Sequence, residues 1–281
     1  MRTLVLGGGG IVGRAMVAEA GRRGWPVRGC GRAEVDLLDV AAVERSVAEC
    51  RPELVVNCAA FTQVDRCESE PEAAFAVNGA AVGALAEASA RSGARLIQIS
   101  TDYVFDGEGR APYLEEHPTA PKSVYGSSKL EGERRALSVP GSLVVRTSWI
   151  FGVGGANFVD TIAAKIRAGE NRLKVVADQL GGPTWAPFLA SALADLGECG
   201  ASGIVHYQNR PPATWHDLAC AIARRLEPGG GVEIEPVTTA EFPRPARRPA
   251  YSVLAVERFE RLAGRKVESW SEGLDRHLAS A

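Results

Sequence analysis

A strand, a glycine turn and a helix follow one another at the start of this chain, and this order restricts the fold more than any other feature. Arg2–Leu6 is a short apolar run typical of a β-strand, and Arg14–Arg23 carries apolar residues at helical spacing. Between them, glycines 7, 10 and 13 fit the pattern G-x-x-G-x-x-G. In such a unit the first glycine permits the tight turn, the second lets the backbone approach a pyrophosphate, and the third lets helix and strand pack closely. A plain flexible turn is the alternative, but the flanking strand and helix favour nucleotide binding, because a helix N-terminus attracts anions.

Apolar runs continue to alternate with helical segments as far as residue 150. The later expected strands are Trp25–Cys30, Leu54–Ala60, Arg95–Ile99 and Leu143–Arg146, and the expected helices are Val40–Cys50, Pro71–Ser92 and Val124–Leu137. This alternation predicts an α/β fold, with a Rossmann-type, doubly wound parallel sheet in a dinucleotide-binding domain over residues 1–150. Residues 151–281 are less regular and are expected to form mainly a smaller C-terminal substrate-binding lobe, with part of 185–207 packing back on the sheet. The Pro- and Arg-rich segment 241–249 predicts an extended loop over a site or a surface.

The end of the second expected strand indicates which dinucleotide fits. Sites that prefer NAD usually carry an acid there for the ribose 2′-hydroxyl, whereas an arginine accommodates a 2′-phosphate. Here the strand ends in Gly29-Cys30-Gly31-Arg32, without an acid. A solvated surface arginine is the alternative reading of Arg32, but its charge favours NADPH as the cofactor over NADH. Small residues that end the third expected strand, Ala59 and Ala60, would let a cofactor lie against the backbone.

The segment Tyr125-Gly126-Ser127-Ser128-Lys129 carries the chemistry that the sequence indicates. Residues four apart share one face of a helix, so Tyr125 and Lys129 are expected to point the same way. The ammonium group would favour the phenolate and lower the phenol pKa from its usual value near ~10. Thr101, at the end of the fourth expected strand, would hold a carbonyl oxygen against the phenol. A solvated Tyr–Lys pair is the alternative, but the three residues together predict proton transfer on or off a C–O group.

Composition excludes several other classes of protein. The formal net charge is −2, and the Arg-rich piece 244–248 is too short to form a basic surface for nucleic acid. We therefore expect no nucleic-acid partner. The six cysteines contain no C-x-x-C pair and are interpreted as reduced thiols of a cytoplasmic protein, without a disulfide framework or a zinc site. The first expected strand leaves no room for a signal peptide, and no apolar run is expected to approach the ~20 residues of a membrane span. We therefore expect a cytoplasmic protein without a membrane partner, as a monomer or a weak homo-oligomer.

Taken together, these segments resemble the extended short-chain dehydrogenase/reductase superfamily, and they look most like the dTDP-4-dehydrorhamnose reductases. The resemblance covers nearly the whole chain and is carried by Gly7–Gly13, Arg51-Pro52, Val56-Asn57, Ser100–Gly107, Tyr125–Glu133, Arg146–Trp149, Asp178–Thr184, Thr214–His216 and Arg248–Leu254. It implies that hydride from a nicotinamide reduces the C4 ketone of a nucleotide-linked 6-deoxy-4-hexulose, as in dTDP-rhamnose biosynthesis. A nucleotide sugar is then the expected small-molecule partner.

The resemblance also implies roles for individual residues. Tyr125 would give a proton to the nascent alkoxide, Lys129 would hold the nicotinamide ribose, and Thr101 would orient the ketone oxygen. Asp102 and Trp149 would contact the substrate, the tryptophan through its flat apolar face. The cofactor would be bound by Gly7, Gly10, Ile11, Val12 and Gly13 at the pyrophosphate, by Arg32, Asp36 and Leu37 at the adenosine end, and by Ala59, Ala60, Phe61 and Thr62 on the far side.

The chain departs from the family at one place. Some family members dimerise through a magnesium site built from glutamates. The matching segments here are 14–16, 185–188 and 276–279, and none of them contains a carboxylate. Because magnesium requires oxygen ligands, we expect neither that site nor that dimer.

Three other functions compete with a reductase. A sugar-nucleotide dehydratase needs a pair of acids directly after the threonine, and Tyr103 stands where the second acid should be, which disfavours that activity. An epimerase would need further groups beside the ketone; Cys58, Cys67 and His216 are candidates whose positions the sequence does not give. The third is a non-catalytic, NADP-binding regulatory subunit like that of methionine adenosyltransferase. The complete threonine, tyrosine and lysine set favours an enzyme over that role.

Overall fold

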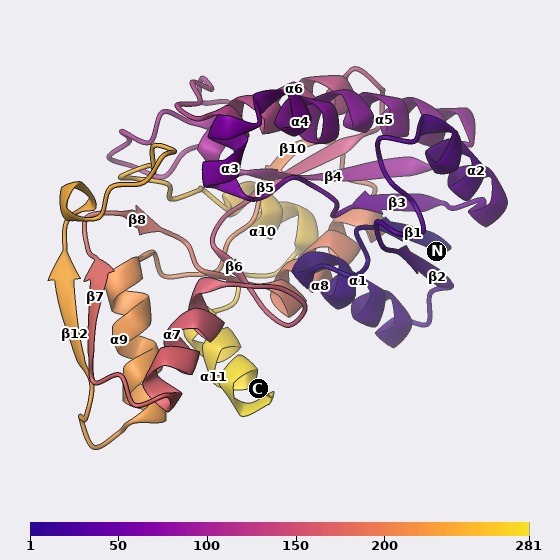
Figure 1. Cartoon of the computed structure of the whole chain (residues 1–281). Helices are drawn as coiled ribbons and strands as arrows, with labels where there is room; N and C mark the ends of the chain where they lie inside the picture. The colour runs from indigo at the N-terminus through magenta and orange to yellow at the C-terminus, as the bar shows by residue number, and fades with distance from the viewer. Residues whose placement is uncertain (281) are drawn as a thin grey trace.

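In the computed structural model, which describes residues 1–280, six parallel strands form a sheet with helices on both faces and a smaller lobe at one end (Figure 1). The strands lie in the order β10-β5-β4-β3-β1-β2, with β1 at Thr3–Leu6, β2 at Val27–Cys30, β3 at Leu54–Asn57, β4 at Arg95–Thr101, β5 at Leu143–Thr147 and β10 at Gly203–His206. Because β1 pairs with β2 on one side and with β3 on the other, the direction of winding reverses at β1. Leu6 lies opposite both Cys30 and Asn57, so the turns after these three strands meet at one edge of the sheet. The expected α/β fold with a doubly wound parallel sheet is confirmed.

Both faces of the sheet are apolar and covered. One layer consists of α1 (Ile11–Arg22), α8 (Ala186–Glu198) and α10 (Glu257–Ala263), and the other of α2 (Val40–Cys50), α5 (Ala81–Arg91) and α6 (Val124–Leu137). Val5 of β1 packs in the core of the first layer, whereas Leu4 and Leu6 pack in the core of the second. Successive side chains of a strand point to opposite faces, so a strand between two helix layers needs apolar residues at every position.

The smaller lobe has a core of its own. It consists of α7 (Phe158–Arg167), β7 (Arg172–Val176), α9 (Trp215–Leu226), β12 (Glu233–Val237) and α11 (Trp270–Ser280). β12 pairs with β7 in parallel, and α9 packs beside them (Figure 1). Two helices of the lobe begin at side-chain caps: Asn157 accepts a hydrogen bond from Asp160 N, and Thr214 forms a reciprocal capping box with Asp217.

Part of the chain returns from the lobe to the sheet. After the short strands at residues 180–185, α8 packs along α1, and β10 then pairs with β5 from Gly203 opposite Leu143 to His206 opposite Arg146. The outer strand of the sheet is thus supplied by chain that follows the first lobe elements.

One helical segment corrects an expectation. Pro71–Arg91 runs through α4 (Pro71–Phe75), a π-helical turn (Ala76–Ala80) and α5, and over its 21 residues it is long and apolar enough to cross a membrane by composition. The expectation that no apolar segment approaches that length is therefore wrong. With 56% of its most apolar window buried inside the protein, and with contacts to α6 and β4, it is a core helix of the sheet layer.

Several elements were not predicted from the sequence. They are α3 (Val64–Ser69), a 3₁₀ turn at Asp102–Val104, β6 (Ile150–Phe151), β8 (Leu180–Gly181), β9 (Thr184–Trp185), β11 (Ala213–Thr214), a 3₁₀ turn at Thr239–Glu241, and β12, α10 and α11. Most are short and lack a periodic pattern. β12 reads Glu-Ile-Glu-Pro-Val, a poor strand sequence that becomes a strand through its pairing with β7.

Candidate active site

The glycine turn after β1 is shaped by close backbone packing. Gly7 has φ +74°, and a Cβ there would lie 2.6 Å from Ala59 N, in the turn after β3. A Cβ on Gly13 would lie 2.1 Å from the Gly7 carbonyl oxygen, so this residue lets α1 approach the strand. Gly10 is the N-cap of α1 and has extended backbone, and among the described residues no side chain caps the helix there. The N–H groups of the first turn are thus left for a ligand, and the cradle fits a dinucleotide pyrophosphate.

The segment after β3 forms the opposite wall of this cradle. Ala59 N donates to Asn57 Oδ1 at 3.1 Å, and Phe61 N donates to Asn78 Oδ1 at 2.8 Å. The Asn78 amide also donates to the Phe61 carbonyl and to Ser128 Oγ on α6, each at 3.0 Å. One asparagine in the π-helical turn therefore fixes the segment containing Ala60, Phe61 and Thr62 to the helix that carries the tyrosine. The sequence analysis missed Asn78, although it is a lone amide in an apolar helix.

At the adenosine end, Arg32 lies at the surface just after β2. Its side chain is 81% exposed and forms an ion pair with Asp36 at 3.3 Å. Asp36 Oδ1 also accepts from Leu38 N, and this bond and Arg32 lower the pKa of Asp36. Leu37 differs from expectation: its side chain is buried in the core under the sheet, so only its backbone can face an adenine.

The tyrosine, lysine and threonine come together at the carboxyl end of β4. Ser123 caps α6 by accepting from Gly126 N, and the helix then presents Tyr125 and Lys129. Lys129 is buried, and its Nζ donates to the carbonyl of Ile99 on β4 at 2.6 Å. The Thr101 hydroxyl lies close enough to the Tyr125 phenol to lower the pKa of the phenol. The structure therefore places on neighbouring elements the three groups that the sequence indicated.

The electrostatics of Tyr125 run opposite to the expectation. Burial, together with the negative charge of Asp102, raises the pKa of the Tyr125 phenol above its usual range, and this outweighs the effect of Thr101. Burial also lowers the pKa of Lys129 to about 8, although Glu133 and Cys58 act in the other direction. The expectation that Lys129 lowers the pKa of Tyr125 is thus wrong for the protein without a bound cofactor, because the pKa of Tyr125 is raised. A phenol held in its protonated form is nevertheless the form that can donate a proton.

Asp102 lies beside Thr101 and is not among the residues that line the large cavity described below. It is 3% exposed, and one carboxylate oxygen accepts from the Thr101 hydroxyl at 2.9 Å. Burial raises the pKa of Asp102 to about 6, against the opposing effects of the nearby Ser252 and Thr101. Within residues 1–280 its other oxygen has no well-formed hydrogen bond. The expected contact of Asp102 with substrate stays a prediction; in the structure its carboxylate accepts a hydrogen bond from Thr101.

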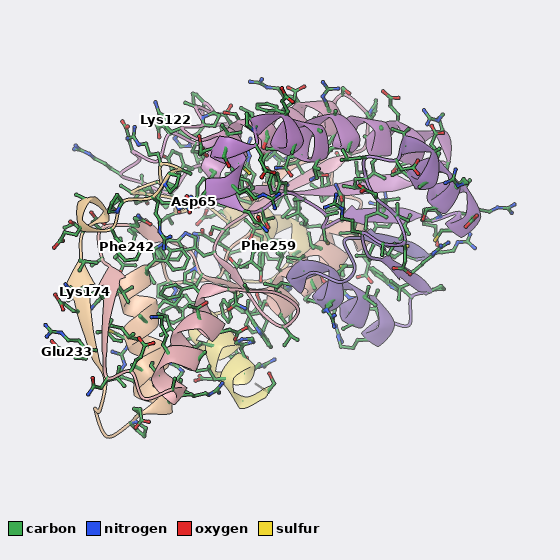
Figure 2. All side chains as sticks on the ribbon, in the orientation of Figure 1. Asp65, Lys122, Lys174, Glu233, Phe242 and Phe259 are labelled. Carbon is green, nitrogen blue, oxygen red and sulfur yellow. The ribbon has the colours of Figure 1, made fainter. Side chains whose placement is uncertain are left out.

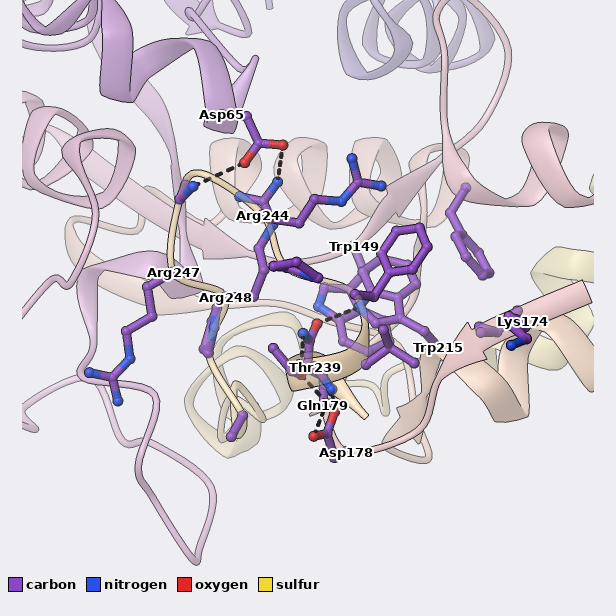
Figure 3. A pocket seen from close by; sticks show the side chains of 18 of the residues that line it. Asp65, Trp149, Lys174, Asp178, Gln179, Trp215, Thr239, Arg244, Arg247 and Arg248 are labelled. Atoms are coloured by element: carbon purple, nitrogen blue, oxygen red, sulfur yellow. Dashed lines mark hydrogen bonds and ion pairs between the residues drawn. The ribbon is translucent and has the colours of Figure 1, made fainter. Parts of the chain in front are cut away.

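A cavity of about 1050 Å³ lies between the sheet domain and the lobe. Its wall includes Asp65 and Tyr103 from one side and Lys174 and Phe242 from the other. Figure 2 labels Asp65, Lys174 and Phe242, and Figure 3 shows the pocket from close by. The glycine turn is not part of this wall, and neither are Thr101, Tyr125 and Lys129. The volume of the cavity is large for a small ligand and suits an extended one.

Trp149 reaches this cavity as one half of a stacked pair. The centre of its ring lies 3.6 Å from that of Trp215, with 6° between the planes (Figure 3). Phe158 packs on Trp215. Gly181 lies against the Trp149 ring, because a Cβ there would be 2.6 Å from Trp149 Cε2. Trp149 also has φ +46°, an unusual conformation for a bulky residue and one that often marks a functional site. The expected free flat face is therefore partly covered, and Trp215, which lay in a motif but had no predicted role, shares the position.

The candidate epimerase groups take up different positions. Cys58 lies near Lys129, and burial raises the pKa of its thiol to about 12; burial likewise raises the pKa of Cys67, near Tyr125. His216 lies in the lobe, with Nε2 3.1 Å from the Ile234 carbonyl. Thiols that remain protonated are poor bases, so the arrangement disfavours proton abstraction beside a ketone.

For a metal ion, residues 1–280 offer no group of three or more His, Cys, Asp or Glu side chains. At the positions expected to lack magnesium ligands, Arg14 Nε donates to the Gly9 carbonyl at 2.8 Å, and His277 Nε2 lies 2.7 Å from Asp160. The absence of a magnesium site stays a prediction.

A glycine cradle where the sheet reverses, with a threonine, tyrosine and lysine at the adjacent strand end, defines a Rossmann-type reductase of the extended short-chain dehydrogenase/reductase class. Comparison with known proteins gives the family. The pattern of the RmlD substrate binding domain family matches residues 1–281. The chain belongs to this family, that of the dTDP-4-dehydrorhamnose reductases.

Individual relatives agree over nearly full length. A dTDP-4-dehydrorhamnose reductase from Streptomyces griseus is 44% identical over 280 residues, which cover 97% of this chain and 91% of the relative. A probable dTDP-4,6-dihydroxy-2-methyloxan-3-one 4-ketoreductase from Streptomyces antibioticus is 41% identical, covering 98% of this chain and 93% of the relative. The crystal structure of dTDP-4-dehydrorhamnose reductase from Bacillus anthracis in complex with NADP superimposes with a TM-score of 0.94 at 33% identity, covering 100% and 99% of the two chains.

Proposed function

We propose that this protein is an NADPH-dependent reductase of the C4 ketone of a nucleotide-linked 6-deoxy-4-hexulose, acting in deoxysugar biosynthesis as the dTDP-4-dehydrorhamnose reductases do. The observation that carries the proposal is the meeting of Thr101 and Tyr125 beside Lys129, at the sheet edge next to the glycine turn. A regulatory protein would have no need of this complete set.

In this proposal two parts of the chain bind the two ligands. Residues 1–150 hold the cofactor, and 151–281 mainly hold the sugar nucleotide, except for β10, which belongs to the sheet, and α8 and α10, which cover it. The pyrophosphate would lie on Gly7 and the backbone of Gly10–Gly13, and Arg32 would pair with the 2′-phosphate. Bound NADPH supplies the hydride.

The remaining chemistry belongs to side chains of the protein. Thr101, held beside Tyr125 by its hydrogen bond to Asp102, orients the ketone oxygen; to donate to that oxygen, its hydroxyl must give up the bond to Asp102. Tyr125 gives its proton to the developing alkoxide, which suits a phenol whose raised pKa keeps it protonated. Lys129, anchored on Ile99, holds the nicotinamide ribose. Trp149 and Trp215 line the cavity that would receive the sugar nucleotide.

The test is NADPH oxidation with a dTDP-4-keto-6-deoxyhexose, in the wild type and in Tyr125→Phe. We expect wild-type turnover and a loss of at least about 100-fold in kcat for the variant, since general acid catalysis typically contributes that much. The variant should retain its affinity for NADPH, measured by fluorescence titration. Equal turnover in both proteins would remove Tyr125 as the acid, and no turnover in a wild type that binds NADPH would reject the reductase.

A further inference from the structure

The segment of residues 246–252, here called the strap, runs from the lobe across the sheet domain. Tyr251 N donates to the Gly107 carbonyl at 3.0 Å, and a Cβ on Gly107 would lie 2.6 Å from Pro249 Cβ. The strap therefore lies directly on the chain that follows β4, a few residues after Thr101. Its path over the cavity wall is seen in Figure 3.

Asp65 of α3 holds the strap with both of its carboxylate oxygens. Oδ1 accepts from Ala246 N at 3.2 Å, and Oδ2 forms an ion pair with Arg248 Nη2 at 3.0 Å. The Asp65 and Arg248 side chains are 31% and 21% exposed, so this pair is better shielded from solvent than an ordinary surface ion pair. Because α3 belongs to the sheet domain and the strap comes from the lobe, Asp65 joins the two parts next to the cavity.

Arg248 also contacts the neighbourhood of the catalytic tyrosine. Arg248 and Tyr103 both line the cavity, and the positive charge of Arg248 counteracts the burial that raises the pKa of Tyr103. The Tyr103 ring packs edge-on against the Tyr125 ring, with 5.4 Å between centroids and 79° between planes. The Tyr103 carbonyl is pressed against α6 as well, since a Cβ on Gly126 would lie 2.2 Å from it. A shift of Tyr103 would therefore displace the Tyr125 ring.

We propose that Arg248 is a positioning residue for the reduction: held by Asp65, it fixes Tyr103, and Tyr103 fixes the ring of Tyr125. The proposal rests on the proposed function, because it needs Tyr125 to be the proton donor. It gives the strap a role in the chemical step, in addition to closing the cavity. The sequence signal is slight, an Arg-Pro pair in a Pro- and Arg-rich loop, and nothing in it points to Asp65.

Direct binding of substrate by Arg248 is the competing role. Its Nη1 is buried, and within the described chain it has no hydrogen-bond partner, so it could serve a ligand in the cavity. The two roles differ in what they change. A direct contact present in both substrate and transition state changes KM, whereas a misplaced proton donor changes the rate of the chemical step.

The experiment measures the single-turnover rate of NADPH oxidation and the KM for a dTDP-4-keto-6-deoxyhexose in Arg248→Gln, Asp65→Asn, Tyr103→Phe and the double variant Arg248→Gln/Tyr103→Phe. Arg91→Gln is the control, because Arg91 forms an exposed ion pair with Glu44, between α2 and α5, and does not line the cavity. Thermal unfolding and NADPH titration establish that each variant folds and binds cofactor.

We expect each of the first three variants to lose about tenfold in the single-turnover rate, as misplacement of a reacting group by a fraction of an ångström can do. This loss should exceed the change in KM, to which the same three side chains contribute because they line the cavity. In the Tyr103→Phe background, Arg248→Gln should add less than about twofold, because the same contact is already broken. The control should match the wild type.

A raised KM with an unchanged single-turnover rate in Arg248→Gln would overturn the proposal in favour of direct substrate contact. A full tenfold effect of Arg248→Gln in the Tyr103→Phe background would overturn the path through Tyr103. If Arg248→Gln does not fold, the Asp65→Asn and Tyr103→Phe variants decide, and wild-type rates in both would overturn the proposal. Failure of the proposed function is distinct, since the wild type itself would then not oxidise NADPH with the sugar nucleotide.

Discussion

Replacing Gly13 with alanine tests how the glycine turn is built. A Cβ at this position would lie 2.1 Å from the Gly7 carbonyl oxygen, 2.7 Å from its carbonyl carbon and 2.8 Å from Gly8 Cα. All three are backbone atoms, so a change of rotamer cannot relieve the contact, and α1 must move away from β1. Gly9 is a matched control in the same turn, because among residues 1–280 a Cβ there meets no atom within 4 Å.

The size of the effect follows from these contacts. Overpacking a close-packed site costs ~1–3 kcal/mol, and rigid backbone neighbours favour the upper half of that range. For a chain of this size such a loss lowers Tm by roughly 3–5 °C. Displacement of α1 also moves the N–H groups that face the pyrophosphate, so we expect Kd for NADPH to rise by about tenfold, or ~1.4 kcal/mol. Gly9→Ala should change the unfolding free energy by less than ~0.5 kcal/mol.

Thermal unfolding followed by circular dichroism and fluorescence titration with NADPH measure both quantities. The result that would refute the reasoning is a Gly13→Ala protein that matches Gly9→Ala in Tm and in Kd. In that case the close approach of α1 to the strand would not be what positions the cradle.

Three further predictions follow from the site. Asp102 has a folded-state pKa of about 6, above its ordinary value, so the folded protein holds this proton more tightly than the unfolded chain does. The contribution of Asp102 to stability therefore falls as pH rises from about 4 to about 6. Asp102→Asn should flatten this dependence and raise stability at pH 7 by about 2 kcal/mol, measured by urea unfolding across pH. Asn78→Ala removes hydrogen bonds to Phe61 and Ser128, and we expect a loss of about 2–3 kcal/mol and weaker NADPH binding, measured by denaturation and titration. Trp215→Ala removes one ring of the stacked pair and should raise KM for the sugar nucleotide about tenfold, with Kd for NADPH unchanged in fluorescence titration.

Each of these has an outcome that contradicts it. A pH dependence of stability that is the same in Asp102→Asn and wild type would place the titration elsewhere. Wild-type stability of Asn78→Ala would mean that the segment after β3 does not depend on that amide. A change in NADPH affinity, and not in KM, for Trp215→Ala would place the stacked pair at the cofactor.

Much of the sheet domain could be predicted because its signals are local. α6 begins at Val124 and ends at Leu137, as expected, since a serine cap and a helical pattern lie within the segment itself. The roles of Gly7 and Gly13 also follow from the order strand, turn, helix. β12, by contrast, has no strand propensity of its own and forms only because β7 lies beside it.

The site was predictable in its residues and less so in its energetics. The spacing of residues along the chain predicts the catalytic set of Tyr125, Lys129 and Thr101. It does not predict the pKa of Tyr125, which depends on the burial of its ring and on the charge of Asp102. Asp65 and Arg248 lie far apart in the sequence and on different parts of the fold, so no local pattern relates them. Tertiary packing alone brings them together.

The return of the chain as α8 and β10 has a consequence for how this molecule can be divided. A fragment ending at residue 150 would lose the outer strand β10, which would leave β5 as an unpaired edge strand. It would also lose α8, which would expose the apolar surface that includes Val5 and Met16 to water. Such a fragment should aggregate, even though it holds every cofactor contact proposed here. The chain also passes between the sheet and the lobe after β5, before α8, after β10, before α10 and before α11, so the lobe is not attached by a single flexible linker, and any opening is expected as a hinge about these connections.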